Sequence, residues 1–271
     1  MCTIILVHRL RTDASLIVAA NRDEWLARWT RRATRQQHRG VRFLAGTDLE
    51  KGGTWLGASE RGLFVGLTNL PPQPSLPSPP PGGFRSRGEL VREVLACPSL
   101  GAAERLLRSI NGTRWRGFHL AVGDGHRLVL AYGHPAHAEL SFEEAAPGVH
   151  VLPNGRLNDD QPKVRRARAL LRTLNVRGAE LDFLLGELHR RVLADRVRPD
   201  RVPVHPSIPE ALLREVQALC VQTPRYGTRS AALIALRPGR VLRYEAVEGV
   251  PGRAPVRSVA GLLPSFPRTA M

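Results

Sequence analysis

The sequence contains few cysteines, no long apolar run and no signal-like N-terminus, and each absence narrows the class of protein. Its three cysteines, Cys2, Cys97 and Cys220, are too few and too widely spaced for a disulfide framework or a zinc motif. No stretch of about 18 apolar residues occurs, so we expect no membrane span. No charged segment precedes an apolar one at the N-terminus, as a secretory signal would require. We therefore expect a reducing, cytoplasmic setting.

Aromatic residues and lysines are also scarce, although the chain is strongly basic. The formal net charge is +16, aromatic residues make up 5% of the chain, and Lys51 and Lys163 are its only lysines. Proteins that bind nucleic acid gather basic residues in a patch and place aromatic residues among them. These arginines are instead spread along the whole chain. We expect no specific nucleic-acid partner, and the charge is compatible with an anionic small molecule.

The length of 271 residues fits one layered domain. We expect this domain to cover residues 1–249, and residues 250–271, which hold four prolines, to form a mobile tail. A second proline-rich segment, Pro71–Gly83, holds seven prolines and cannot join a core. This segment could be a surface loop, a lid beside a pocket, or a ligand for a proline-recognising domain. The sequence indicates no oligomeric state.

Local patterns predict both strands and helices. The expected strands cover residues 3–7, 16–20, 63–67, 118–132 (a hairpin), 231–236 and 241–247, and the expected helices cover residues 86–96, 99–110, 162–174, 179–194 and 209–220. Ser86 and Glu89 form a capping box at the first helix. Gly52 and Gly53 indicate a close approach of two backbones. The arginine-rich stretch 28–42 is expected to be a loop over a site or a solvated surface segment.

Cys2 is the candidate catalytic residue, because a methionine that precedes a small residue is usually removed. Loss of Met1 would leave Cys2 with both a thiol and a free α-amino group. A thiol is nucleophilic only as the thiolate, with an unperturbed pKa of about 8.5, and an α-amino group titrates near roughly 7.7 to 8. One residue could thus supply a nucleophile and its base, as N-terminal threonine does. The alternative is a cysteine without a role behind the initiator methionine.

Four consecutive polar residues, Asn21–Glu24, follow an apolar segment. Polar groups at the end of a buried strand must be paired or must face a site. Arg22 could hold the Cys2 thiol as thiolate, and Asp23 could accept a hydrogen bond from the terminal ammonium. The alternative is a strand-end turn in which Arg22 forms an ion pair with Asp23 or Glu24 at the surface.

Several short blocks follow one another in a recognisable order. They are Met1-Cys2, Ala19–Glu24, Gly52–Gly57, Leu67–Asn69, Ser86–Val91, Leu152–Asn154 and Tyr226–Arg229. In order and spacing they resemble the NRDE family, which takes its name from the tetrad and includes transport and Golgi organisation protein two. That family is similar to the N-terminal nucleophile (Ntn) hydrolases of the choloylglycine and penicillin V acylase type. The resemblance implies an α+β fold, a four-layer αββα sandwich.

The resemblance also implies hydrolysis of an amide or a thioester of a small molecule by acyl transfer, with Cys2 as nucleophile. Asn69 would donate a hydrogen bond to the oxyanion, an interaction worth about 2.7 to 4 kcal/mol, or would only cap the following turn. Asn154 would orient the N-terminus or the substrate, although Asn158 lies close enough in sequence to compete. Arg229 would lie near the nucleophile and favour the thiolate, or form an ion pair at a strand edge. This chemistry needs no metal or organic cofactor.

A different class of function is binding without turnover. The family has been linked to haem and to lipids or acyl-coenzyme A. A cysteine pocket flanked by arginines could hold propionates, phosphates or an acyl chain. Because a cysteine thiolate can ligate haem iron, haem is a candidate ligand.

Overall fold

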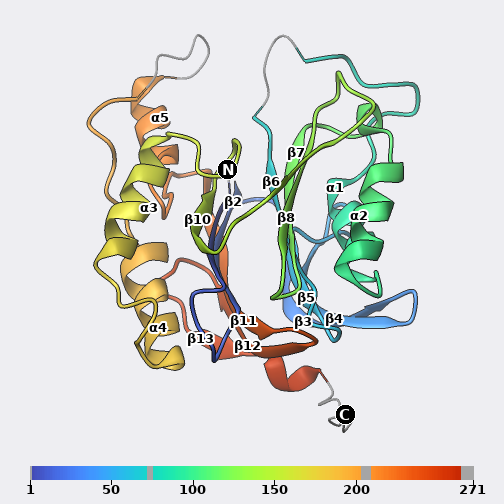
Figure 1. The fold of residues 1–271 in the computed structure, drawn as a ribbon. Helices are drawn as coiled ribbons and strands as arrows, with labels where there is room; N and C mark the ends of the chain where they lie inside the picture. Colours follow the sequence, from blue (N-terminus) through green and yellow to red (C-terminus); the bar gives the residue numbers. More distant parts are fainter. Residues whose placement is uncertain (1, 72–75, 203–208, 264–271) are drawn as a thin grey trace, which may run out of the picture.

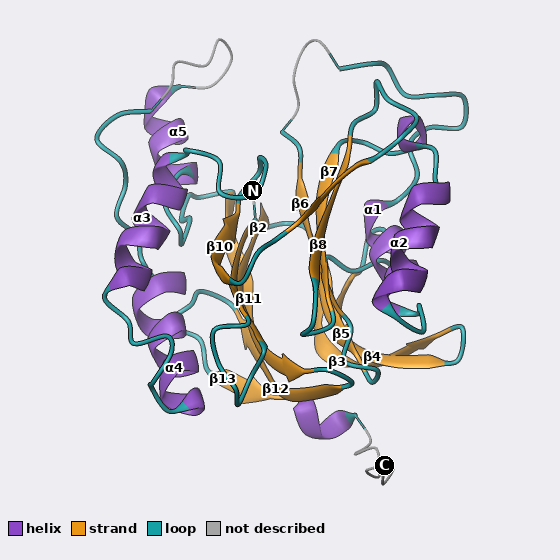
Figure 2. Cartoon of the chain, viewed as in Figure 1, coloured by secondary structure: helices purple, strands orange, loops and turns teal. Residues whose placement is uncertain are grey.

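The computed structural model describes residues 2–71, 76–202 and 209–263. Two antiparallel β-sheets pack face to face, and helices cover the outer face of each sheet (Figure 1, Figure 2). This architecture confirms the predicted four-layer αββα sandwich. None of the helices in the described ranges is long and apolar enough to cross a membrane.

The first sheet has six strands in the order β10-β1-β2-β11-β12-β13. They are β10 (Gly148–Leu152), β1 (Thr3–His8), β2 (Leu16–Trp25), β11 (Tyr226–Arg237), β12 (Arg240–Glu248) and β13 (Val256–Ser258). β1 and most of β2 are apolar and buried on both faces, because one face meets the other sheet and the opposite face meets helices. Since all neighbours are antiparallel, the start of β1 lies beside the ends of β2 and β10.

The second sheet has seven strands that follow one another in chain order. They are β3 (Thr30–His38), β4 (Val41–Asp48), β5 (Leu56–Ser59), β6 (Phe64–Asn69), β7 (Phe118–Gly123), β8 (Leu128–Gly133) and β9 (Ser141–Glu144). The predicted hairpin over residues 118–132 is therefore confirmed.

The helices form two separate outer layers. The layer on the second sheet contains α1 (Arg87–Leu95), α2 (Leu100–Ser109) and the 3₁₀ turn Gly112–Arg114. The layer on the first sheet contains α3 (Pro162–Arg172), α4 (Leu181–Glu187), the π-helical turn Leu188–Leu193 and α5 (Glu210–Val216). A further 3₁₀ turn, Ala260–Leu262, follows β13. Each helix lies within a predicted helical range, and α5 is shorter than expected.

Three apolar clusters fill the three interfaces between the four layers. Leu6 belongs to the cluster between the sheets, whereas Ile5 packs with Leu188 beneath the α3–α5 layer. Val65 packs with Val94 beneath α1 and α2. Adjacent residues of β1 thus serve different interfaces, as the alternation of side chains along a strand requires.

Two segments differ from their expected form. The arginine-rich stretch 28–42 is not a loop, because most of it forms β3, an edge strand hydrogen-bonded to β4. Within the expected tail, Val256–Ser258 form β13 on the edge of the first sheet and Val259 is buried, so this part belongs to the fold. Residues 264–271 of the expected tail lie outside the described residues.

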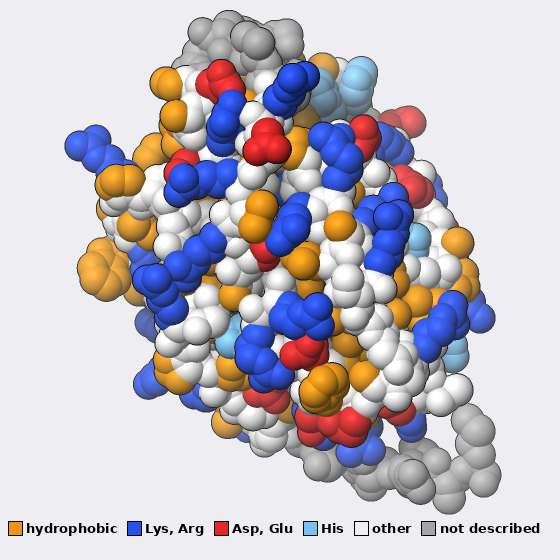
Figure 3. Space-filling model, turned by 90° about the vertical axis from the view of Figure 1, so that its left-hand side faces the viewer, with side chains coloured by type: hydrophobic (Ala, Val, Ile, Leu, Met, Phe, Trp, Pro, Cys, Tyr) orange, Lys and Arg blue, Asp and Glu red, His pale blue; other side chains and the backbone are white. Residues whose placement is uncertain are grey.

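Basic side chains are dispersed over the face formed by the α3–α5 layer. Figure 3 shows Lys and Arg side chains lying among acidic and apolar ones on this face. Several arginines are paired, among them Arg166 with Asp195 at 2.6 Å and Arg243 with Asp182 at 2.7 Å. The visible face thus carries no continuous basic stripe.

Candidate active site

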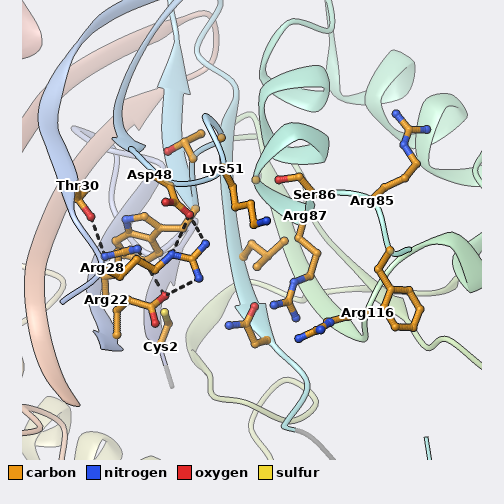
Figure 4. A pocket seen from close by; sticks show the side chains of 18 of the residues that line it. Cys2, Arg22, Arg28, Thr30, Asp48, Lys51, Arg85, Ser86, Arg87 and Arg116 are labelled. Atoms are coloured by element: carbon orange, nitrogen blue, oxygen red, sulfur yellow. Dashed lines mark hydrogen bonds and ion pairs between the residues drawn. The ribbon is translucent and has the colours of Figure 1, made fainter. Parts of the chain in front are cut away.

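Cys2 lies just before β1, at the end of the first sheet where the polar residues at the end of β2 also lie. β1 pairs with β2 through Thr3 opposite Asn21, and with β10 through Ile4 opposite Leu152. The Cys2 side chain is 6% exposed. It lines a cavity of about 410 Å³ whose walls come from both sheets and from the start of α1 (Figure 4).

The tetrad at the end of β2 is divided by the pleat of the strand, because successive side chains point to opposite faces. Arg22 and Glu24 line the cavity, with 3.5 Å between their charged groups. Asn21 and Asp23 are buried and contact the α3–α5 side. The four residues therefore have two different surroundings.

Asn21 links β2 to the helical layer. Its side-chain Nδ2 donates hydrogen bonds to the backbone carbonyls of Leu193 at 2.8 Å and Leu219 at 2.9 Å. These carbonyls belong to the end of the π-helical turn and to the chain after α5. We assign Asn21 a structural role, because its amide is directed away from the cavity.

Asp23 belongs to a buried polar group behind Cys2. Its Oδ1 accepts a 2.6 Å hydrogen bond from the Thr228 hydroxyl, which itself accepts one from the Val221 N–H. Lys163 of α3 places Nζ 3.9 Å from Asp23 Oδ2 and 3.4 Å from Thr3 Oγ1. Burial raises the pKa of Asp23 and lowers the pKa of Lys163, and the attraction between the two charges opposes both shifts.

The surroundings of Cys2 raise the pKa of its thiol. Burial raises the pKa of the Cys2 thiol and the Asp23 carboxylate adds to this shift, whereas the Arg22 guanidinium lowers the pKa. The net direction is upward. Arg22 thus acts in the expected sense but does not by itself supply a thiolate, so a nucleophilic role for Cys2 requires a base.

One wall of the cavity holds both of its carboxylates. Arg22 donates a 3.0 Å hydrogen bond to Thr30 Oγ1. Arg28 pairs with Asp48, and its Nη1 lies 3.7 Å from Glu24 Oε2 (Figure 4). Although burial alone would raise it, the hydrogen bond from Arg28 lowers the pKa of Asp48. The two acids of the cavity are therefore neutralised by its own arginines.

The cavity also carries positive charge without a matching acid. Lys51, Arg87 and Arg116 all line the cavity (Figure 4). Arg87 donates a 2.9 Å hydrogen bond to the Gly117 carbonyl, and burial together with Arg116 lowers the pKa of Arg87 to about 10. Within the described ranges, no carboxylate forms a salt bridge with any of these three side chains. The cavity therefore favours an anionic group.

Close backbone packing fixes the part of the cavity wall at the start of α1. A Cβ at Gly53 would lie 2.4 Å from the carbonyl carbon of Gly88, and Thr54 N donates a 3.1 Å hydrogen bond to Gly88 O. The predicted close approach is thus confirmed and joins the β4–β5 connection to α1. Ser86 caps α1 by accepting a hydrogen bond from Glu89 N at 3.4 Å, as the capping motif predicts.

Three asparagines expected near the site have different positions. Asn69 ends β6 and lines the cavity. Asn154 donates from Nδ2 to the Asn69 carbonyl at 2.7 Å and does not itself line the cavity, so it holds the Asn69 backbone from behind. Asn158 accepts from Val151 N at 3.0 Å and therefore fixes the chain after β10.

The structure does not bring Arg229 to the Cys2 cavity. The pairing of β11 with β2 is irregular between Thr228 and Ser230. Arg229 donates to the Leu26 carbonyl and lines a second pocket of about 800 Å³. Arg229 therefore does not lie beside Cys2, where the family resemblance predicted it.

Lys163 and Arg87 are among the residues of the site that were not singled out from the sequence. Lys163 stands four positions before Ala167 on the buried side of α3, and a lysine on an apolar helical stripe is a usable signal. Arg87 stands inside the capping motif of α1, where an arginine is unremarkable, so no local pattern marks it.

Sequence comparison places the chain among known proteins. The profile of the family described as Transport and Golgi organisation 2 matches residues 1–247. The Transport and Golgi organization protein 2 homolog of Bos taurus is 33% identical over 236 residues, which covers 81% of each chain. The homolog of Homo sapiens is 30% identical over 240 residues, again covering 81% of each chain.

Solved structures with the same fold are Ntn hydrolases. A variant of the conjugated bile acid hydrolase from Clostridium perfringens gives a TM-score of 0.54 at 12% identity, covering 99% of this chain and 100% of that one. The N-acylethanolamine-hydrolyzing acid amidase ortholog of Caenorhabditis elegans gives 0.53 at 13% identity, covering 88% and 93%. Penicillin V acylase from Agrobacterium tumefaciens gives 0.50 at 12%, covering 96% and 86%. These identities show the fold alone, whereas the profile and the curated relatives show that the chain belongs to the Transport and Golgi organisation 2 family.

Proposed function

We propose that the protein is an Ntn hydrolase in which Cys2, once Met1 has been removed, cleaves an amide or a thioester of a small molecule. The observation that carries this proposal is the position of Cys2, which lines a cavity beside Arg22 with the Asp23–Lys163 pair behind it. The names of the fold relatives, a bile acid hydrolase, a penicillin V acylase and an acid amidase, describe acyl-transfer hydrolases. That likeness supports the reaction class for this chain and leaves the substrate open.

The first half-reaction forms an acyl-enzyme. The α-amino group of mature Cys2 takes the thiol proton while sulfur attacks the substrate carbonyl carbon, and the carbonyl electron pair moves to oxygen. Collapse of this oxyanion breaks the bond to the leaving amine or thiolate. The α-ammonium returns its proton to the leaving group, and a thioester remains on Cys2.

The second half-reaction consumes one water molecule. The same amino group takes a proton from water as the water oxygen adds to the thioester carbon. The new oxyanion expels the Cys2 sulfur, which recovers the proton. The products are a carboxylic acid and the free enzyme.

The surrounding residues support these steps. Because burial raises the pKa of the Cys2 thiol, the thiol needs a base to remove its proton, and the α-amino group would serve as that base. Asp23 would accept a hydrogen bond from the α-ammonium, and Lys163 would favour the charged form of Asp23. Asn69, whose backbone is held by Asn154, would donate to the oxyanion together with a backbone N–H. Arg229 is assigned no step.

The test is intact-mass analysis of native protein before and after brief treatment with iodoacetamide, with the labelled site mapped. We expect loss of Met1 and faster labelling of Cys2 than of Cys97 or Cys220, which are also buried and free. A thioester probe should then acylate Cys2 and be released with time, and Cys97→Ala should behave as wild type. Retained Met1, or a Cys2 that reacts no faster than the other two cysteines, would contradict the mechanism.

A second candidate, binding without turnover, is favoured by the unmatched positive charge of Lys51, Arg87 and Arg116 in the cavity. These side chains could pair with the phosphates of acyl-coenzyme A or with haem propionates. Haem ligation through Cys2 would require the thiolate, which the raised pKa of the thiol disfavours, so a phosphate-bearing acyl compound is the better match. Organic extraction of the purified protein followed by mass spectrometry would detect a bound acyl compound, and an absorption spectrum would detect haem. Either ligand would favour binding over the enzyme hypothesis.

A further inference from the structure

Large apolar side chains gather on the surface next to the cavity. Of the nine large hydrophobic side chains exposed within the described ranges, four are Trp25, Leu26, Trp29 and Leu49, with exposed fractions of 58%, 41%, 70% and 50%. Leu49 N donates a 3.0 Å hydrogen bond to Trp29 O, so the β2–β3 turn and the turn after β4 lie side by side. Single exposed apolar residues are ordinary, whereas a group of four, here called the tryptophan rim, indicates an interaction surface.

The tryptophan rim borders the mouth of the Cys2 cavity. Its residues alternate along the chain with Glu24, Arg28, Asp48 and Lys51, which line the cavity. On these two turns the side chains that line the cavity are charged, whereas the large exposed side chains that do not line it are mainly apolar. The ring of Trp25 also packs edge-on against that of Tyr226, with 5.5 Å between the centroids. The rim also reaches the second pocket, of about 800 Å³, which Leu26 and Trp29 help to line.

Positive charge flanks the tryptophan rim. Arg31 and Arg32 follow it on β3 and are exposed, as is Arg225, whose carbonyl accepts the Leu26 N–H. In the part of the chain that the structure describes, none of these three arginines forms a salt bridge. Two exposed acids lie near this surface: Glu50, 3.8 Å from Arg28, and Glu248, which lines the second pocket and accepts a 3.1 Å hydrogen bond from Ala33 N. The net charge beside the apolar group is therefore positive.

We propose that the tryptophan rim docks on an anionic lipid bilayer, with Trp25, Leu26, Trp29 and Leu49 in the interface and the flanking arginines at lipid phosphates. Tryptophan prefers the boundary between headgroups and acyl chains, aliphatic side chains gain by leaving water, and arginine adds attraction to an anionic surface. A nucleic acid would use the indoles and arginines but would leave Leu26 and Leu49 in water. Docking would place the cavity mouth beside the bilayer, and it does not depend on turnover at Cys2.

The apolar part of the surface is tested by co-sedimentation with phosphatidylcholine vesicles that contain phosphatidylserine. The double variant Trp25→Ser/Trp29→Ser should lower the partition coefficient at least about tenfold, because interfacial binding scales with the apolar area buried. Phe183→Ser is the matched control, since Phe183 is also 58% exposed but lies on α4. Brominated lipids should quench the tryptophan fluorescence of the wild type and not that of the double variant.

The charged part is tested by Arg31→Ser/Arg32→Ser, which should weaken binding roughly tenfold or more on phosphatidylserine-containing vesicles only, at about 1 kcal/mol per arginine. Arg168→Ser/Arg172→Ser, exposed arginines on α3, should leave binding unchanged. Circular dichroism confirms that each variant is folded.

Equal vesicle binding by wild type and Trp25→Ser/Trp29→Ser would overturn the proposal. So would a change in oligomeric state, or in retention on single-stranded DNA, caused by this double variant without any change in vesicle binding. The first would indicate a protein partner and the second a nucleic acid.

Discussion

Replacing Lys163 by methionine tests whether the buried pair behind Cys2 stabilises the fold. The side chains of Lys163 and Asp23 are 1% and 0% exposed, with 3.9 Å between Nζ and Oδ2. Methionine has a similar length and no charge, so Lys163→Met removes the cation while leaving the space filled. The variant leaves the Asp23 carboxylate in the same buried position without its lysine.

The expected loss is large because removing one partner of a buried pair typically destabilises a protein by about 3–5 kcal/mol. For a chain of this size each kcal/mol lowers Tm by roughly 2–4 °C, so the predicted decrease is about 6–20 °C. Asp23 already has a raised pKa, and Lys163→Met should raise this pKa further. A carboxyl with a higher pKa in the folded state loses stability as pH rises above the unfolded value, so the destabilisation should be larger at alkaline pH than at acid pH.

Thermal and urea unfolding of Lys163→Met, Asp23→Asn and the double variant give the coupling energy of the pair. The double variant should recover a substantial part of the loss, because neither position then holds a buried charge. Lys51→Met is the matched control: this lysine is exposed, and its replacement should change stability by less than about 0.5 kcal/mol. A Lys163→Met variant as stable as Lys51→Met, or a loss that does not depend on pH, would refute the reasoning.

Three further predictions concern buried positions that hold the fold. Burial lowers the pKa of His119 to about 4 from 6.5, so stability should fall as pH decreases from 6.5 towards 4, by about 3 kcal/mol in all. His119→Asn should remove that slope in unfolding curves measured across this range. Gly53→Ala should lower the unfolding free energy by about 1–3 kcal/mol, because the new methyl group would collide with the Gly88 backbone, whereas Gly261→Ala, which meets nothing within 4 Å, should not. Asn21→Ala leaves two buried carbonyls without their donor and should lower stability by about 1–3 kcal/mol for each.

Much of the fold could be predicted because its elements carry local patterns. Ser86 starts α1 where the capping motif indicates, and the hairpin over residues 118–132 follows from two apolar runs around a turn. Residues 28–42 were not predicted as strands, because an exposed edge strand rich in arginine lacks the alternation of apolar residues that marks a half-buried one. The pairing of β13 with β12 depends on tertiary contacts that a short, proline-flanked segment does not reveal.

The candidate site was predictable only in part, since its members come from distant parts of the chain. Cys2, Arg22 and Asn69 line one cavity, as the family motifs suggested. Arg229 does not, because the irregular β11–β2 pairing next to it accompanies its contact with the Leu26 carbonyl. Lys163 follows Thr3 by 160 positions yet donates to its hydroxyl, and no local pattern in the sequence specifies such a contact.

The side chains of Asn21–Glu24 alternate between the two faces of the first sheet, and this alternation links the stability of the fold to the chemistry of the cavity. Arg22 faces the cavity, whereas Asp23 faces α3 and there meets Lys163. A change on α3 that displaces Lys163 would therefore alter the charge of Asp23, and through it the pKa of the Cys2 thiol, which the Asp23 carboxylate raises. Substitutions on the helical layer that never touch the cavity should thus change the alkylation rate of Cys2, and those that weaken the Asp23–Lys163 pair should change it most.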